Sequence, residues 1–214
     1  AMTPKFPDEV TYWTPQFAKT EVKVTKSPLV FVGYGVVAPE YHWNDYAGVD
    51  VKGKTVVILI NDPGNEAKNP DPKFFKGKAM TYYGRWTYKY EEAARRGAAG
   101  VIIVHETAPA SYPWQVVQNS NTNAQFDIVR DNPTAEHTQF ESWIQRPLAV
   151  QLFQRSGLDF EQAKAAAKRR DFRPIPLKAT LSASYAANVQ VITSHNVVGI
   201  LPGSRYPDET VIYS

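Results

Sequence analysis

The chain has 214 residues, 13% aromatic residues, 16 prolines, no cysteine and a net charge of +3. The lack of cysteine excludes disulfides, cysteine–zinc sites and thiol nucleophiles, and no apolar run approaches the roughly 18 to 20 residues that span a bilayer. The one short basic cluster, at 168–170, follows an expected helix whose dipole it complements, which argues against nucleic-acid binding.

The first strong signals along the chain are two apolar strands. Residues 2–25 are proline-rich and weakly patterned, and predict a connecting or edge segment. The apolar runs at 29–32 and 55–60 then predict buried strands, each closed by a turn. The first of these turns, 33–35, reads Gly-Tyr-Gly and lacks the third glycine of a phosphate-binding loop, so it predicts a tight turn.

The best helix of the first half is predicted at 87–96. Apolar side chains fall on one face at helical spacing, and we expect Trp86 and Tyr90 among them to pack in the core. Gly97 suits the end of this helix, and an apolar strand at 100–104 follows. Strand, helix and strand in this order predict a locally parallel sheet covered on both faces.

A long polar stretch, 107–134, is predicted as a functional or mobile loop. The remaining elements of the body are a strand, two helices and a further strand, predicted at 140–144, 147–156, 159–169 and 177–184. Asp159 with Gln162 predicts a capping box at the start of the second of these helices.

The last 26 residues predict a β-hairpin. Strands are expected at 189–192 and 196–201, and a third apolar run reaches Ser214 without a terminating residue. Together with Ala1 before Met2, this suggests a piece of a longer protein. Because an isolated hairpin is marginal, we expect this segment to be disordered, folded onto the body or paired with a second copy, which would be self-association.

Three stretches resemble the protease-associated (PA) domain. They are Phe31-Val32-Gly33-Tyr34-Gly35, Gly53-Lys54-Thr55-Val56-Val57, and the segment from Tyr88 through Ala94 to Gly97 and Val104. The stretch from His105 to Trp114 is similar to the version inserted in bacterial M28-family zinc aminopeptidases. Asn196 to Ser204, followed by Val211 to Ser214, is similar to the opening hairpin of the M28 catalytic domain.

The resemblance implies an α+β fold, with a β-sheet or open β-barrel PA body, flanking helices and a terminal hairpin of an α/β peptidase domain. It places a peptidase-domain stub or linker at 1–24, the PA domain at 25–185 and the start of the catalytic domain at 186–214. The parent would be a periplasmic or extracellular aminopeptidase that acts on peptides with two zinc ions. The family's zinc ligands and catalytic glutamate would follow Ser214, so no catalytic or metal residue is carried over to this chain.

Aromatic residues outside the predicted core are the best candidates for contacts. We expect loop side chains to line a substrate path or face the catalytic domain, and these are Tyr82, Tyr83, Arg85, Tyr112 and Trp114. The functions that remain open are a non-catalytic module of the aminopeptidase, a module that binds peptides or proteins, and an independent hydrolase.

Other polar pairs have simpler explanations. His105-Glu106 fits a hydrogen-bonded strand end better than a pocket, and Ser194-His195 would point to opposite faces of a strand. Asp62 and Asp71 could bind a hard cation, although turn chemistry explains both. The sequence therefore offers no nucleophile–base pair for the hydrolase hypothesis.

Overall fold

The computed structural model describes residues 1–16, 20–65, 70–132 and 134–213. The strands are β1 (Val10–Trp13), β2 (Glu21–Phe31), β3 (Val37–Ala38), β4 (Trp43–Asn44), β5 (Thr55–Leu59), β6 (Gly100–His105), β7 (Phe140–Gln145) and β8 (Ile175–Ala186). The α-helices are α1 (Trp86–Arg95), α2 (Thr107–Ala110), α3 (Trp114–Ser120), α4 (Arg146–Arg155) and α5 (Phe160–Ala167). Two 3₁₀ turns, η1 (Pro39–Tyr41) and η2 (Tyr82–Gly84), complete the elements.

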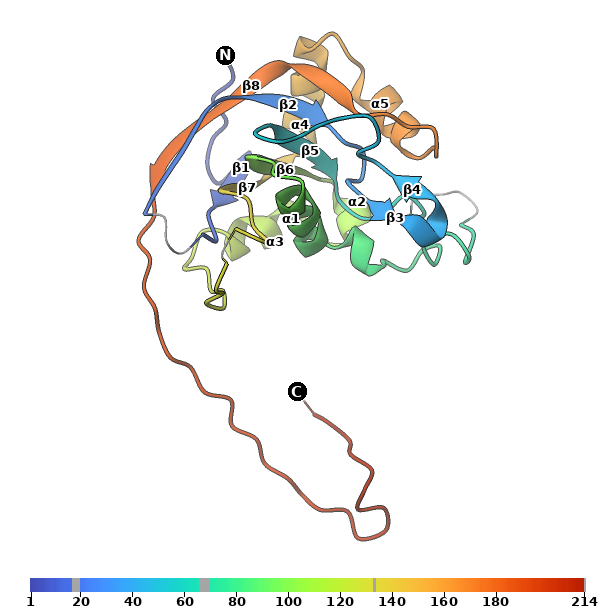
Figure 1. Cartoon of the computed structure of the whole chain (residues 1–214), viewed down its shortest axis with the longest axis vertical. Coiled ribbons are helices and arrows are strands. Elements are labelled where there is room, and N and C mark those ends of the chain that lie inside the picture. The colour runs from blue at the N-terminus through green and yellow to red at the C-terminus, as the bar shows by residue number, and fades with distance from the viewer. Residues whose placement is uncertain (17–19, 66–69, 133, 214) are drawn as a thin grey trace.

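A curled, mixed six-stranded sheet forms the centre of the molecule (Figure 1). Its strand order is β1-β7-β6-β5-β2-β8. The four inner strands run parallel, whereas β1 and β8 pair antiparallel at the two edges. The predicted parallel arrangement of 55–60 and 100–104 around a helix is confirmed, since β5 pairs with β6 and α1 connects them.

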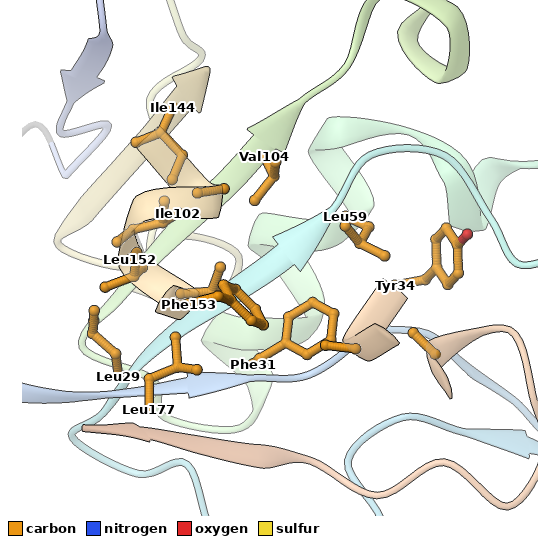
Figure 2. Close-up of a cluster of buried hydrophobic side chains, with 14 of the residues drawn as sticks. Leu29, Phe31, Tyr34, Leu59, Ile102, Val104, Ile144, Leu152, Phe153 and Leu177 are labelled. Atoms are coloured by element: carbon orange, nitrogen blue, oxygen red, sulfur yellow. The ribbon is translucent and has the colours of Figure 1, made fainter. Parts of the chain in front are cut away.

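Alternating side chains of the inner strands divide between two cores. On β5, Val57 and Leu59 face one core, and Val56 and Ile58 face the other. The first core packs against α4 and α5, and Figure 2 shows Leu152 and Phe153 of α4 among its side chains. The second core packs against α1 and α3. Both faces of the central strands are therefore covered, which explains why their sequences are apolar throughout.

The turn at 33–35 requires glycine at both ends. Gly33 has a φ of 58° and Gly35 a φ of 62°, in the left-handed region that favours glycine. A Cβ on Gly33 would lie 3.0 Å from the Phe172 ring, and one on Gly35 would lie 3.0 Å from Ile58. The predicted tight turn is confirmed, and the close approach of the core to the backbone explains the Gly-Tyr-Gly pattern.

The N-terminal part of the sheet extends beyond the predicted strands. Within the stretch 2–25, expected to be a connecting or edge segment, β1 pairs with β7 and β2 begins at Glu21. Lys26, with a φ of 49°, and the register shifts beside it interrupt the pairing of β2 with β8. Such irregularities conceal the period-two pattern, which is why the sequence predicted only 29–32 as a strand.

The stretch 107–134 was wrongly predicted as an uninterrupted loop, because it contains α2 and α3. Valine, asparagine and serine in α3 have modest helix propensity, so this helix depends on tertiary burial. Trp114 and Val117, three positions apart, supply the buried face. The described residues 121–132 contain no helix or strand.

Residues 187–213 leave the end of β8 as an extended segment that runs away from the body (Figure 1). The strands predicted at 189–192 and 196–201 are wrong, because the structure has no strand in this described segment. Val197 and Leu201 are 97% and 96% exposed. Two short strands without a sheet to join are marginal in water, which accounts for the missing hairpin. Self-association through this segment stays a prediction.

The start of α5 confirms the capping prediction at Asp159. Its side chain accepts a hydrogen bond from the backbone N–H of Gln162 at 2.8 Å. We expect Asp159→Ala to lower the free energy of unfolding by about 1 kcal/mol, because an N–H of the first turn loses its partner. Urea denaturation measures the change, and Asp208→Ala in the exposed C-terminal segment is the control.

None of the helices in the described ranges is long and apolar enough to cross a membrane.

Candidate functional site

An aromatic cleft of about 250 Å³ opens on the α1 and α3 side of the sheet. Its walls combine rings from β1, β7, α1 and the segments around α3, and they are Trp13, Trp143, Trp86, Tyr90, Tyr112 and Phe126. Val116, Val117 and three small or amide side chains complete the lining. The described lining residues include no charged side chain, so the cleft presents ring faces and neutral hydrogen-bonding groups.

Helix α1 supplies one wall through two rings on the same face. Trp86 and Tyr90 are four positions apart, with ring centroids 5.9 Å apart and planes at 70°. Tyr90 is 1% exposed and belongs to the core as predicted. Trp86 is 43% exposed, so its predicted place in the core is wrong. It is the first residue of α1, about one turn before Tyr90.

The opposite wall comes from the segment that the sequence left as a loop. Tyr112 lies just before α3, is partly buried, and has its ring 5.8 Å from His105. Phe126, after α3, is 77% exposed and reaches the rim. Of the five predicted contact residues, Tyr112 is the one that lines this cleft.

Tyr82, Tyr83 and Arg85 lie immediately before α1. Tyr82 is 55% exposed and donates a hydrogen bond from its hydroxyl to Glu91 at 2.7 Å. Tyr83 is partly buried and donates to Glu40 at 2.8 Å, and burial together with this bond raises the pKa of Tyr83 to about 12. Arg85 is exposed at the start of α1. Tyr82 and Arg85 are therefore exposed to solvent, whereas the hydrogen bond of Tyr83 to Glu40 attaches η2 to the body.

Trp114 has a structural position. It begins α3, is 7% exposed, and donates from its indole N–H to the carbonyl of Pro7 at 3.3 Å. Its ring packs 5.6 Å from His105. The expectation that Trp114 is a loop residue is wrong, because burial of its ring holds α3 against the second core.

A buried polar cluster lies behind the Trp13 wall. Glu141, opposite Trp13 in the β1–β7 register, is fully buried, and its carboxylate accepts hydrogen bonds from His137 at 3.1 Å and from the Thr138 N–H at 3.2 Å. Burial raises the pKa of Glu141 to about 7. The other ring nitrogen of His137 lies 3.3 Å from a carboxylate oxygen of Asp127.

His137 therefore joins β7 to the segment that carries the rim of the cleft. Burial lowers the pKa of His137, but the hydrogen bond and charge of Glu141 outweigh it, so the pKa is raised. Asp127 is the neighbour of Phe126, and Arg130 pairs with Asp127 at 2.7 Å. The contact of Asp127 with His137 therefore fixes the position of its neighbour Phe126 at the rim of the cleft.

A second buried charge lies on α1, outside the lining of the cleft. Lys89 of α1 is fully buried, and its ammonium donates to the carbonyls of Tyr34, Asn61 and Tyr83 at 2.5, 2.8 and 2.7 Å. Three carbonyl acceptors match the three protons of an ammonium group. Burial lowers the pKa of Lys89, and the nearby carboxylate of Asp45 opposes this shift. Through Tyr83, this contact fixes η2 on α1.

The described residues that line the cleft offer aromatic ring faces and neutral hydrogen-bonding groups. No group of three or more His, Asp or Glu side chains in the described ranges is arranged to hold a metal ion. In the His137 cluster the two ring nitrogens face different carboxylates, so Asp127 and Glu141 do not converge on one ion. The two zinc ions remain an expectation for a longer parent.

The polar pairs weighed from the sequence have local partners. The interpretation of His105 as a hydrogen-bonded strand end is confirmed, with its Nε2 3.0 Å from the Tyr112 carbonyl oxygen. Burial lowers the pKa of His105. Asp62 accepts hydrogen bonds from the N–H and hydroxyl of Thr81, and Asp71 accepts from the Lys73 N–H, as turn residues do. Ser194-His195 lies in the exposed terminal segment, outside any strand.

Of the six rings that line the cleft, sequence reasoning predicted only Tyr112 as a contact residue. Trp13 lies in a segment with weak pattern, and Trp143 lies in the strand predicted at 140–144, to which no contact role was assigned. A tryptophan at the edge strand of a sheet, with charged or polar neighbours in sequence, could have marked Trp13. For Trp143 the sequence holds no such signal, because its wall position follows from the register with β1.

The comparisons with known proteins add one distant structural likeness. No family model matches the chain, and no curated protein matches it. One solved structure, an aminopeptidase from Aneurinibacillus sp. strain AM-1, is similar with a TM-score of 0.31 and 19% identity. The match covers 84% of this chain and 32% of that chain, so this chain spans about a third of the aminopeptidase's length. A likeness at this level assigns neither a family nor an activity.

Proposed function

We propose that this chain is a non-catalytic protease-associated module of a secreted zinc aminopeptidase, and that its aromatic cleft binds an apolar side chain of a peptide. The cleft carries the proposal: six rings surround about 250 Å³, and Trp86 is 43% exposed at its mouth. Exposed apolar surface of this kind marks binding sites for peptides and proteins. Ring faces and neutral amides favour an uncharged, bulky side chain.

The sequence resemblance supports the peptidase context. The three stretches that resemble the PA domain form the end of β2 with its turn, the start of β5, and α1 with β6. These elements are neighbours in the inner sheet and on its α1 face. The resemblance thus falls on the structural centre of the body rather than on scattered loops. Zinc dependence, secretion and the PA role itself rest on this resemblance alone.

Peptide binding is tested with two tetrapeptides, Ala-Phe-Ala-Ala and Ala-Ala-Ala-Ala, titrated while tryptophan fluorescence is followed. We expect the phenylalanine peptide to bind and Trp86→Ala to weaken it about tenfold, because one exposed wall of the cleft is lost. Tyr206→Ala removes an exposed ring from the terminal segment and is the matched control. Equal binding of both peptides, or binding unchanged by Trp86→Ala, would contradict a role for the cleft.

The non-catalytic part of the proposal has a separate test. We expect the purified chain with added zinc to release no amino acid from aminopeptidase substrates, because its described residues offer no zinc ligand set. Turnover that survives chelation and repurification would refute this part and favour an independent hydrolase.

The second candidate function is a stand-alone module that binds peptides or proteins without a peptidase. Tyr82 and Arg85, which precede Trp86 by four and one positions in the sequence, are exposed, and this favours a surface larger than one side chain. A parent aminopeptidase distinguishes the two functions: within it, Trp86→Ala should change KM for peptides with large apolar residues. An unchanged KM together with peptide binding by the isolated chain would favour the stand-alone module.

A further inference from the structure

A second and larger cavity, of about 580 Å³, lies on the opposite side of the sheet from the aromatic cleft. It lies beside α4, and several of its lining side chains belong to the first core. Its deep wall comes from β2, β6, β7 and α4, and Figure 2 shows four of these side chains: Leu29, Ile102, Ile144 and Leu152. The function proposed above makes no use of this cavity.

The interior of this cavity is aliphatic. Seven leucine, isoleucine and valine residues line it together with Ala1, Met2, Pro4 and Ala179, and Phe140 is the one aromatic ring among the described lining residues. The hydroxyl of Ser142 is already engaged, donating to the Val101 carbonyl at 2.8 Å. The volume falls within the range of about 300 to 1,000 Å³ typical of small-molecule sites. Such a wall favours a flexible hydrocarbon chain over a planar or polar ligand.

The rim of the cavity is cationic. Lys26 on β2, Lys178 on β8 and Arg155 at the end of α4 line it, and all three are exposed. Within the described ranges no aspartate or glutamate lines the cavity, and none of these three side chains forms an ion pair. The guanidinium of Arg155 donates to the carbonyl of Ala1 at 3.2 Å.

Both lysines lie where β2 pairs with β8. Lys26 has a φ of 49° at the irregularity between β2 and β8, and its backbone N–H donates to the Ser182 hydroxyl at 3.0 Å. Lys178 lies on the strand paired with β2. The backbone conformation of a β-bulge redirects a side chain from the regular alternation. Lys26 of β2 and Arg155 of α4 therefore supply the cations at this opening. The side chain of Lys178 alternates with the core-facing Leu177 and Ala179 and lies on the other face of β8.

We propose that this cavity binds a single-chain fatty acid, with the alkyl chain along the aliphatic wall and the carboxylate at the cationic rim. Charge complementarity carries the choice of ligand. Lys26 and Arg155 form no ion pair within the described ranges and have no described acid beside them in the cavity lining, so the rim favours an anionic head group. The aliphatic interior favours an unbranched apolar tail. A cationic or neutral amphiphile of the same chain length fits the aliphatic interior but lacks the negative charge that the rim favours.

The test uses isothermal titration calorimetry of the whole chain with dodecanoate, dodecanol and dodecyltrimethylammonium, each below its micelle concentration. We expect dodecanoate to bind with one site per chain, dodecanol to bind about tenfold more weakly, and dodecyltrimethylammonium to give no saturable binding. Failure of dodecanoate to bind, or equal affinity for the three amphiphiles, overturns the proposal.

Variants locate the site. The double substitution Lys26→Gln and Arg155→Gln should weaken dodecanoate about tenfold and leave dodecanol unchanged, because the rim charges act on the carboxylate alone. Lys23→Gln, an exposed lysine of β2 outside the cavity lining, is the matched control. Ala179→Phe, which fills space at the wall, should weaken both ligands. Dodecanoate binding that none of these variants changes would place the ligand elsewhere and overturn the proposal.

Two other occupants appear as distinct outcomes. Displacement of dodecanoate by a peptide with an apolar, free C-terminus would assign the site to peptides. Release of dodecanoate as the protein concentration rises would show that a second copy of the chain occupies the cavity. Either result overturns the fatty-acid proposal and leaves the function of the aromatic cleft unaffected, because the cleft is tested by Trp86→Ala.

Discussion

Replacement of Lys89 by methionine should lower the free energy of unfolding by about 3 to 5 kcal/mol, the largest effect expected for any single change described here. Methionine keeps the approximate length of the side chain and removes its three N–H donors. The carbonyls of Tyr34, Asn61 and Tyr83 then lose their partner in a site closed to water. The buried carboxylate of Asp45 also loses its neighbouring cation.

Urea denaturation followed by circular dichroism measures this loss, with Lys23→Met on the exposed side of β2 as the control. The control should change stability by less than about 0.5 kcal/mol. Loss of a cooperative transition in Lys89→Met would be the extreme form of the expected result. A variant as stable as the unmodified chain would contradict the conclusion that Lys89 fastens η2 and the 33–35 turn to α1.

The stability of the chain should fall as pH rises from about 4.5 to 7, and Glu141→Gln should remove part of this fall. Burial raises the pKa of Glu141 from 4.5 to about 7 in the folded state. Between these values the folded chain holds a proton that the unfolded chain has released. The unfolding free energy therefore decreases with pH across this window. The raised pKa of His137 acts in the same direction at the upper end of the window.

The expected difference is measured by urea denaturation of both chains at pH 5, 6, 7 and 8. Near pH 5 the two should have similar stability, and at pH 8 Glu141→Gln should be more stable by about 1 to 3 kcal/mol. Gln154→Glu, at an exposed position of α4, adds a carboxylate outside the buried cluster and is the control. Parallel pH profiles for the unmodified chain and Glu141→Gln would show that Glu141 ionises normally in the folded state.

The same cluster connects pH to the proposed peptide site. Asp127, which contacts His137, is adjacent to Phe126 at the rim of the cleft. The charged groups around His137 are Asp127 and Arg130 from the rim segment, Glu136 beside it, and Glu141 from β7. Peptide titrations and denaturation at the same pH values therefore report on the same contacts.

The sequence by itself determined the inner sheet and most of the helices. The apolar runs of β5 and β6, the amphipathic pattern of α1 and the glycines at 33 and 35 each depend on local pattern, which a single chain displays directly. The capping bond of Asp159 is equally local, because it joins residues three positions apart. These predictions held since burial on both faces leaves little freedom in residue type.

The tertiary structure alone decided which aromatic rings share a cleft and which charges are buried. Trp13 and Trp143 line the same cleft because β1 pairs antiparallel with β7 across more than a hundred residues, a register that no local pattern reveals. Lys89 reads as a polar helix position, and its burial follows from three carbonyls brought from separate turns. The prediction of the terminal hairpin was wrong for the converse reason. Its sequence favours strands, but a strand needs a neighbouring sheet to supply its hydrogen bonds.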